Sequence, residues 1–172
     1  MDAARSAGDT CAVTPDSSPP QPAVVVNPLY ADRNTGHSFA NAFEMIDAYL
    51  ARYADERGVP IDPLDATGYT QIKRGSAHIG INVLEENGVL MLLAPMMQVP
   101  EQNREGFYRK LLELSFLATS DAAFAIDGKK EIVYVRALRR LSALDFEELD
   151  DLLQTVGAIA DEWDGALQRE FG

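Results

Sequence analysis

Residue types that could perform covalent or metal chemistry are scarce in this chain. It has a single cysteine, Cys11, and two histidines, His37 and His78. A thiolate nucleophile needs a fixed base at hydrogen-bond distance, whereas Cys11 lies in a proline-rich stretch that we expect to be mobile. A zinc site needs several cysteine or histidine ligands, and His78 has no second ligand at helical or hairpin spacing. The sequence therefore predicts no catalytic residue, no metal site and no cofactor.

Carboxylates are the abundant ionisable groups, and five of them cluster near the start of the predicted last helix. This acidic face comprises Asp145, Glu147, Glu148, Asp150 and Asp151. The run lacks the Asp-x-Asp-x-Asp-Gly spacing of a calcium loop, so we interpret it as a solvated helix face that could steer a basic partner. A carboxylate-dependent enzyme stays an alternative, and it requires a concave pocket in which acids converge.

The overall composition argues against several classes of partner. The 172 residues contain 27 acidic and 15 basic side chains, which gives a net charge of −12 at pH 7. This excess disfavours nucleic acid and anionic membrane, because both need clustered lysine and arginine. No stretch approaches the roughly 20 apolar residues of a membrane span. With 47% hydrophobic residues the chain can bury a core, and one cysteine without a recognisable export signal predicts a cytoplasmic protein.

The chain divides into two parts of different composition. Residues 1–37 hold five of the nine prolines and no periodic apolar face, so this segment is predicted to be a disordered Pro-rich tail. One apolar run, Val24-Val25-Val26, leaves open whether the tail docks as an edge strand or binds a partner by strand addition. Residues 38–172 are predicted to form a single α+β domain.

Apolar periodicity in residues 38–172 predicts the order helix, three strands, helix, two strands, helix. The first helix is expected to start at an N-cap, Ser38, and the last helix repeats apolar residues every three or four positions from Leu149 to Phe171. Asn87-Gly88 indicates a two-residue hairpin turn, which would place Val83 opposite Leu92. Strands joined by hairpins pair antiparallel. The predicted fold class is therefore α+β, an antiparallel sheet of about five strands with helices packed on it.

The same hairpin pattern assigns alternate residues to two faces of the sheet. One face is apolar on both strands and is predicted to be core. On the other face lie Leu84, Met91, Leu93 and Met97, and methionine-rich faces suit variable peptide partners. Either a helix or the tail covers these residues, or they form a dimer or client surface together with Trp163 of the last helix.

The order of these elements and their pattern of apolar and polar residues resemble the YbjN family and the type III secretion chaperone fold of the CesT type. The resemblance covers residues 38–172, and its main segments are Ile79-Gly-Ile-Asn-Val-Leu-Glu-Glu-Asn-Gly-Val-Leu, Phe124-Ala-Ile-Asp-Gly and Leu144-Asp-Phe-Glu-Glu-Leu-Asp-Asp-Leu-Leu. It implies a small acidic, non-enzymatic and often dimeric protein that binds another polypeptide. We therefore expect a homodimeric, chaperone- or adaptor-like module that binds a protein client, with a small-ligand-sensing regulator as the alternative.

Overall fold

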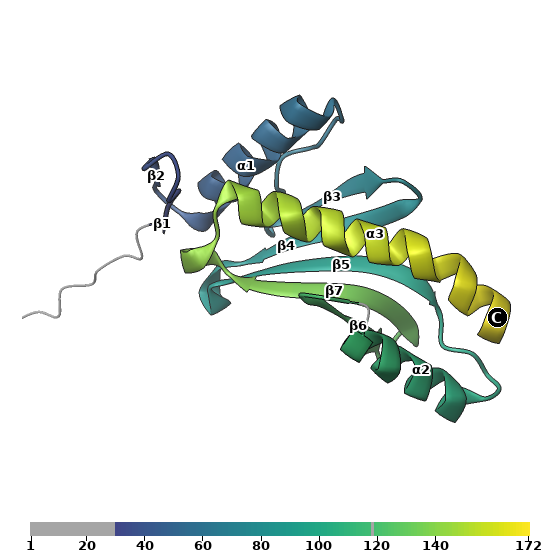
Figure 1. The fold of residues 1–172 in the computed structure, drawn as a ribbon. Coiled ribbons are helices and arrows are strands. Elements are labelled where there is room, and N and C mark those ends of the chain that lie inside the picture. The colour runs from purple at the N-terminus through teal and green to yellow at the C-terminus, as the bar shows by residue number, and fades with distance from the viewer. Residues whose placement is uncertain (1–29, 118) are drawn as a thin grey trace, which may run out of the picture.

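The computed structural model describes residues 30–117 and 119–172, which form three helices, a five-stranded sheet and a two-stranded sheet (Figure 1). The helices and strands are, in chain order, β1 (Tyr30–Ala31), β2 (Ser38–Phe39), α1 (Ala42–Arg57), β3 (Tyr69–Arg74), β4 (Ala77–Leu84), β5 (Val89–Gln98), α2 (Arg104–Leu117), β6 (Ala122–Asp127), β7 (Ile132–Arg140) and α3 (Phe146–Phe171). The predicted α+β class and the order of the main elements are confirmed.

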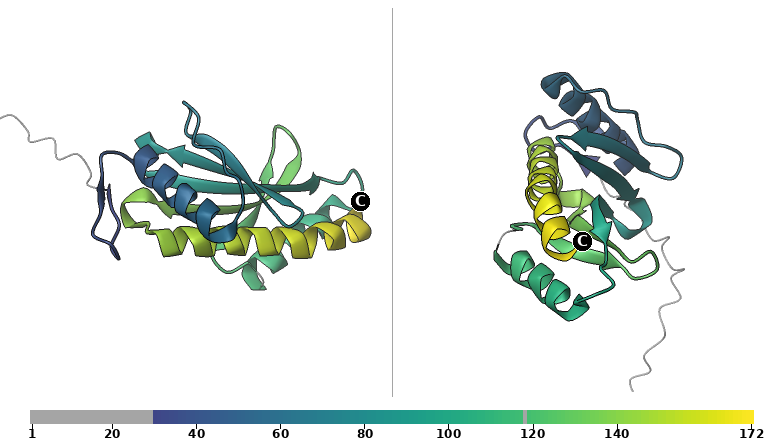
Figure 2. Two further views of the ribbon diagram at one scale, coloured as in Figure 1. Left: turned by 90° about the horizontal axis from the view of Figure 1, so that it is seen from above. Right: turned by 90° about the vertical axis from the view of Figure 1, so that its right-hand side faces the viewer.

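The large sheet is antiparallel throughout, with the strand order β3-β4-β5-β7-β6. Side chains alternate between its two faces, and on one face they are buried beneath the helices. This set includes Ile79, Ile81, Val83, Leu90, Leu92 and Ala94. The buried residues of α1, α2 and α3 belong to the same two clusters as strand residues of this face. Figure 2 (right) shows α3 lying along one side of the sheet. We call the covered face the helix side and the opposite one the outer face.

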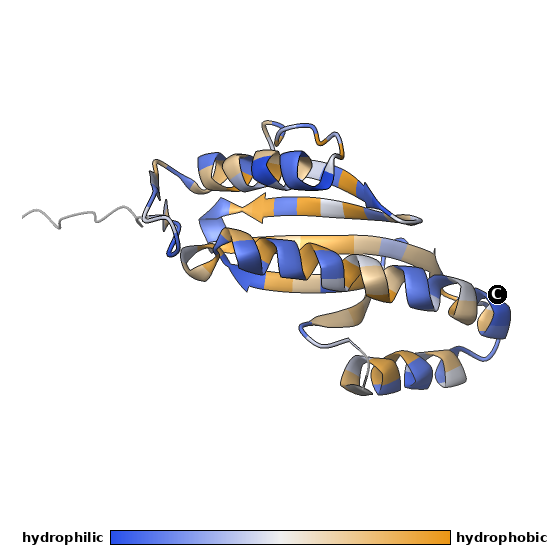
Figure 3. Ribbon diagram, turned by 45° about the horizontal axis from the view of Figure 1, so that its top comes forward, coloured by the Kyte–Doolittle hydropathy of each residue, from blue (hydrophilic) through white to orange (hydrophobic). Residues whose placement is uncertain are grey.

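Hydropathy follows this layering. Figure 3 shows that the central strands of the large sheet are hydrophobic along most of their length, whereas α1 and α3 alternate hydrophobic and hydrophilic residues along each turn. Such a stripe lets a helix bury one side and keep the other in water. In α3 the stripe places Leu149, Leu153 and Val156 in the core with no exposed surface, which confirms the predicted periodicity of the last helix.

The β4–β5 hairpin pairs two residues away from the predicted register. Val83 lies opposite Leu90 and not Leu92. The chain makes a 3-10 turn over Glu85–Asn87, and Gly88, with φ of 64°, caps this turn before the return strand starts at Val89. A displacement of two residues keeps every side chain on its expected face, so the error in register leaves the prediction of core and outer residues intact.

Side chains that cap the helices fix where α1 and α3 begin. Asn41 is the N-cap of α1, and its side chain accepts a hydrogen bond from the backbone N–H of Glu44 at 2.9 Å. Ser38 instead pairs with Ala31 in the two-stranded sheet, so the prediction of Ser38 as the N-cap is wrong. At α3 the N-cap is Asp145, whose side chain accepts a hydrogen bond from the backbone N–H of Glu148.

Residues 30–37 belong to the folded domain and not to the tail. β1 pairs with β2, and buried Tyr30 and Phe39 join the main core. The carboxylate of Asp32 holds the turn between the two strands by accepting a hydrogen bond from the backbone N–H of Thr35 at 2.7 Å. The predicted tail boundary at residue 37 is therefore too late. The rest of the predicted tail, with Cys11 and the run of three valines, lies outside the described residues.

A bulge near the end of β5 changes which way its last side chains point. The register between β5 and β7 shifts between Pro95 and Gln98, and a bulge of this kind interrupts the alternation of faces. Met96 and Met97 both pack against helix-side clusters as a result. The prediction that Met97 lies on the outer face is therefore wrong.

Candidate partner-binding surfaces

The outer face of the large sheet carries apolar side chains along its centre. Leu84, at the end of β4, is 38% exposed, and Met91 and Leu93 of β5 are half-buried. β7 adds Leu138, which lies opposite Met91 and is 41% exposed. All three helices pack on the opposite side of the sheet, so none of them covers these residues. We call Leu84, Val89, Met91, Leu93 and Leu138 the apolar ladder.

The other two residues predicted for this surface lie on the helix side. Trp163 of α3 packs between the two core clusters, and its indole Nε1 is buried without a hydrogen-bond partner among the described residues. Met97 lines an open pocket together with Val99 and Phe171, at the C-terminal end of α3. The sheet thus separates Met97 and Trp163 from the apolar ladder, and the five predicted residues do not form one surface.

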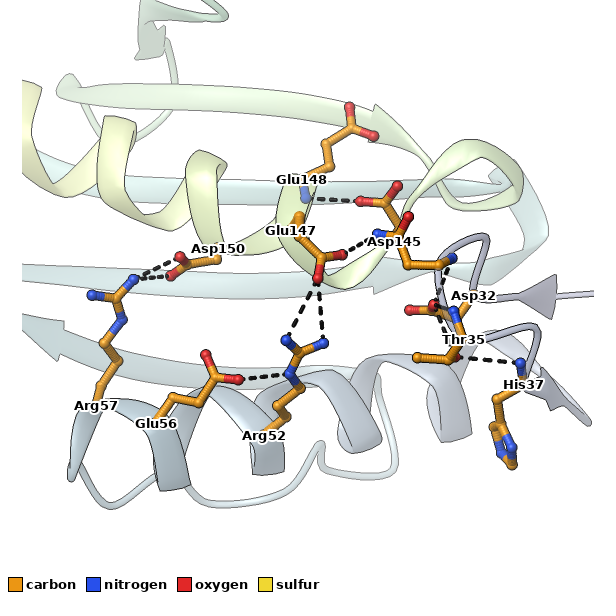
Figure 4. Close-up of polar contacts among 11 residues, drawn as sticks. Asp32, Thr35, His37, Arg52, Glu56, Arg57, Asp145, Glu147, Glu148 and Asp150 are labelled. Atoms are coloured by element: carbon orange, nitrogen blue, oxygen red, sulfur yellow. Dashed lines mark hydrogen bonds and ion pairs between the residues drawn. The ribbon is translucent and has the colours of Figure 1, made fainter.

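Two of the five acidic residues predicted on α3 bind α1 (Figure 4). Asp150 accepts two hydrogen bonds from one guanidinium nitrogen of Arg57, at 2.9 and 2.6 Å. Glu147 lies 3.5 Å from Arg52, whose guanidinium also stacks 3.7 Å from the centre of the Phe146 ring. Exposed ion pairs of this kind are each worth at most about 1 kcal/mol, so they help to align α1 with α3 more than they stabilise the fold.

The remaining acidic residues near the start of α3 have separate roles. The carboxylate of Asp145 accepts a hydrogen bond from the backbone N–H of Glu148 at 2.9 Å. The side chain of Glu148 accepts one from Arg139 of β7 at 2.7 Å, and Asp121 pairs with the same arginine. Asp151 is exposed and has no ion-pair partner within the described ranges. The predicted acidic face is thus mostly engaged in contacts within the chain.

A second apolar surface, which sequence reasoning did not single out, lies on α2. The side of α2 that carries Phe107 and Leu111 is buried, but Leu112 is 72% and Phe116 88% exposed. The edge strand β6 adds Ile126, and Leu112 and Ile126 line the same shallow pocket between helix and strand. We call Leu112, Phe116 and Ile126 the α2 patch. The only sign of this patch in the sequence is that Leu112 and Phe116 lie beside the apolar stripe of α2, which Phe107, Leu111 and Leu114 already complete.

Positive charge gathers on the outer face. The five strands of the large sheet contain five basic residues and one acid, whereas α3 contains eight acids and one arginine. Arg74 and Arg139 are on the helix side, where they bind Gln154 and Glu148. The other three are exposed and have no ion-pair partner in the part of the chain that the structure describes: Lys73, Arg136 and Arg140.

The carboxyl groups with a perturbed pKa have structural roles. Burial raises the pKa of Asp32, but hydrogen bonds from Thr35 and other neighbours outweigh burial and leave the pKa below its ordinary value. Hydrogen bonds within their own turns lower the pKa of Asp65 and of Asp127. A general acid at neutral pH needs a raised pKa, so none of these three groups is suited to the alternative of a carboxylate-dependent enzyme.

Within residues 30–117 and 119–172, no three His, Cys, Asp or Glu side chains are grouped so that they could hold a metal ion. Over the same ranges, no helix has both the length and the apolar character that a membrane span requires.

The fold and its surfaces define a class of protein: a small α+β domain whose distinctive features are two exposed apolar surfaces. The sequence profile of the Tir chaperone protein (CesT) family matches residues 50–164, and the chain therefore belongs to this family. The predicted resemblance to CesT-type chaperones is confirmed. No curated protein has a significant sequence match to the chain.

Solved structures share the fold at low sequence identity. A chain in the crystal structure of the ExsC–ExsE complex is 21% identical, with a TM-score of 0.62 over 74% of this chain and 96% of its own length. A chain of the HopA1–SchA chaperone–effector complex is 11% identical, with a TM-score of 0.54 over 70% and 91%. One from the heterodimeric ExoU–SpcU complex of the type III secretion system of Pseudomonas aeruginosa is 18% identical, with a TM-score of 0.53 over 69% and 93%.

Proposed function

We propose that this protein is a non-enzymatic chaperone that holds a segment of a protein client on the outer face of its sheet. The observation that carries the proposal is the apolar ladder, a row of aliphatic and methionine side chains on a face that no helix of the described residues covers. Membership of the Tir chaperone protein family and similarity to a chain of a chaperone–effector complex support the same proposal.

The proposed mechanism is sequestration. A client segment that lies on the ladder removes apolar surface from water on both molecules, at about 25 cal/mol per Å². The negatively charged helix layer stays exposed on the other side of the sheet and keeps the complex soluble. We place this action in the cytoplasm, a reducing compartment in which a single thiol such as Cys11 stays reduced.

The test introduces a charge into the ladder of the full chain. Leu93→Asp is compared with Ala158→Asp, which adds the same charge at an exposed position of α3. Each protein is expressed in the native host at its natural level, purified by affinity, and its bound polypeptides are identified by mass spectrometry. We expect the unaltered chain and Ala158→Asp to retain one stoichiometric partner and Leu93→Asp to lose it, with unchanged circular dichroism. Retention of the partner by Leu93→Asp would remove the outer face from consideration.

The protein is further proposed to be a homodimer, with the α2 patch as its interface. The support is the position of the patch beside β6, the free edge strand of the large sheet. A two-fold interface brings the same surface of both copies together. Each apolar residue of the patch is therefore buried in both copies when the dimer forms. Native mass spectrometry of the eluates from the previous experiment reports the number of copies of this chain directly.

A further inference from the structure

We propose that the outer face selects a client segment with acidic side chains on either side of an apolar one. The inference rests on the proposed function and adds the chemistry of the partner. The relevant residues lie on two neighbouring strands. Val89, Met91 and Leu93 of β5 pair in register with Arg140, Leu138 and Arg136 of β7.

The register places an arginine at each end of an apolar position. Arg136, Leu138 and Arg140 are exposed alternate residues of β7, so all three point to the outer face. At about 3.3 Å per residue, the two arginines lie about 13 Å apart along the strand. Leu138 stands between them, and the apolar residues of β5 flank it. The surface is therefore an apolar strip with a cation at each end.

Neither arginine forms an ion pair within residues 30–117 and 119–172, in contrast to Arg139, which two acids neutralise. Glu85 and Glu86 line the same pocket as Arg140 without pairing with it. A guanidinium has five donors in a fixed fork that suits a carboxylate. The chain carries a large excess of acid, yet places almost none of it on the strands of the large sheet. An acidic partner is thus repelled by the helix side and attracted by the outer face, which orients it on the sheet.

The complementary ligand follows from the spacing. An extended peptide also advances about 3.3 Å per residue, so carboxylates four positions apart match the two arginines. An aliphatic residue midway between them would lie over Leu138 and Met91. The probe is a fluorescently labelled peptide of about ten residues with glutamates four positions apart and leucine or threonine elsewhere. A matched peptide carries lysines at those two positions.

Binding is measured by fluorescence anisotropy with the full chain, in low and in physiological salt. The glutamate peptide is expected to bind more tightly than the lysine peptide. Arg136→Glu is expected to weaken the glutamate peptide by about tenfold, because the change removes an attraction and adds a repulsion. The double variant Arg136→Glu, Arg140→Glu is expected to reverse the preference and to bind the lysine peptide. Arg169→Glu, an equal charge change at an exposed position of α3, is expected to alter neither affinity.

Several results would overturn the inference. Equal affinity for both peptides would mean that the outer face does not discriminate between ligands by their charge. Competition by a DNA duplex would mean that the arginines of the outer face bind phosphate groups and do not select a carboxylate. Dissociation of a dimer in Arg136→Glu, without any peptide binding, would mean that a second copy occupies the face. The Leu93→Asp capture experiment separates these failures from failure of the proposed function, because a client can depend on the apolar ladder and not on Arg136.

Discussion

The sharpest test of the proposed homodimer is a single substitution, Phe116→Glu. The Phe116 side chain is 88% exposed on α2, so the monomer gains almost nothing from it. Burying a phenylalanine contributes about 1.5–3 kcal/mol, and a two-fold interface buries both copies. Loss of the two rings therefore costs about 3–6 kcal/mol of dimer stability. Since 1.4 kcal/mol is a factor of ten, the dissociation constant should rise by about a hundredfold or more.

The substitution is chosen so that the monomer stays folded. Glutamate is a good helix former, and position 116 faces away from the buried side of α2 that holds Phe107 and Leu111. Sedimentation equilibrium over a range of concentrations gives the dissociation constant, and urea unfolding gives the stability of the fold. Ala158→Glu adds the same charge on α3 and controls for net charge. An unaltered chain that is already monomeric at tens of micromolar, or a Phe116→Glu variant that dimerises as tightly as the parent, would refute the reasoning.

Further predictions concern the fold that supports these surfaces. Because the folded state lowers the pKa of Asp32, the ionised carboxylate stabilises the fold above its ordinary pKa of 3.8, and this stabilisation is lost as pH falls through the lower folded-state pKa. The urea midpoint of the unaltered chain should therefore fall over this acidic range, and Asp32→Asn should show a smaller fall. Gly75→Ala should destabilise the fold by about 2 kcal/mol, measured by thermal unfolding, because Gly75 has φ of 60° and an added Cβ would collide with the Asp161 carboxylate. Arg57→Ala, which removes the exposed pair with Asp150, should cost less than about 1 kcal/mol in the same assay, and a larger loss would show that the pair is not merely an aligning contact.

The faces of the sheet could be predicted because they depend only on alternation. The β4–β5 hairpin was expected to turn in two residues at Asn87-Gly88, yet Glu85–Asn87 form a 3-10 turn. The pairing moves by two positions, and Ile81 and Leu92 still lie on the buried face. Register depends on the geometry of a short turn, which local residue preferences fix weakly. Burial depends on a period of two that runs through the whole strand.

The errors in the candidate site and in the domain boundary arise where that period is interrupted or where a contact is long-range. Strict alternation from Met91 places Met97 on the outer face, and the bulge before Gln98 turns its side chain to the helix side. Tyr30 has no periodic pattern around it, and it is buried only because β1 pairs with β2 beside the core. The predicted acidic residues Glu147 and Asp150 proved to have partners on α1, which lies far away in the sequence.

The separation of charge between α3 and the large sheet has a consequence for how fast a partner can arrive. In dilute salt, where the Debye length is about 30 Å at 0.01 M, an approaching acidic molecule is repelled by the net charge of −12. Near 0.15 M the Debye length is about 8 Å, so the partner responds only to the nearby face and its arginines. Raising the ionic strength should therefore first accelerate association and later, once the local attraction is screened as well, slow it. Most oppositely charged pairs show only the slowing, so a maximum in the association rate would be the kinetic signature of a molecule whose two sides carry opposite signs.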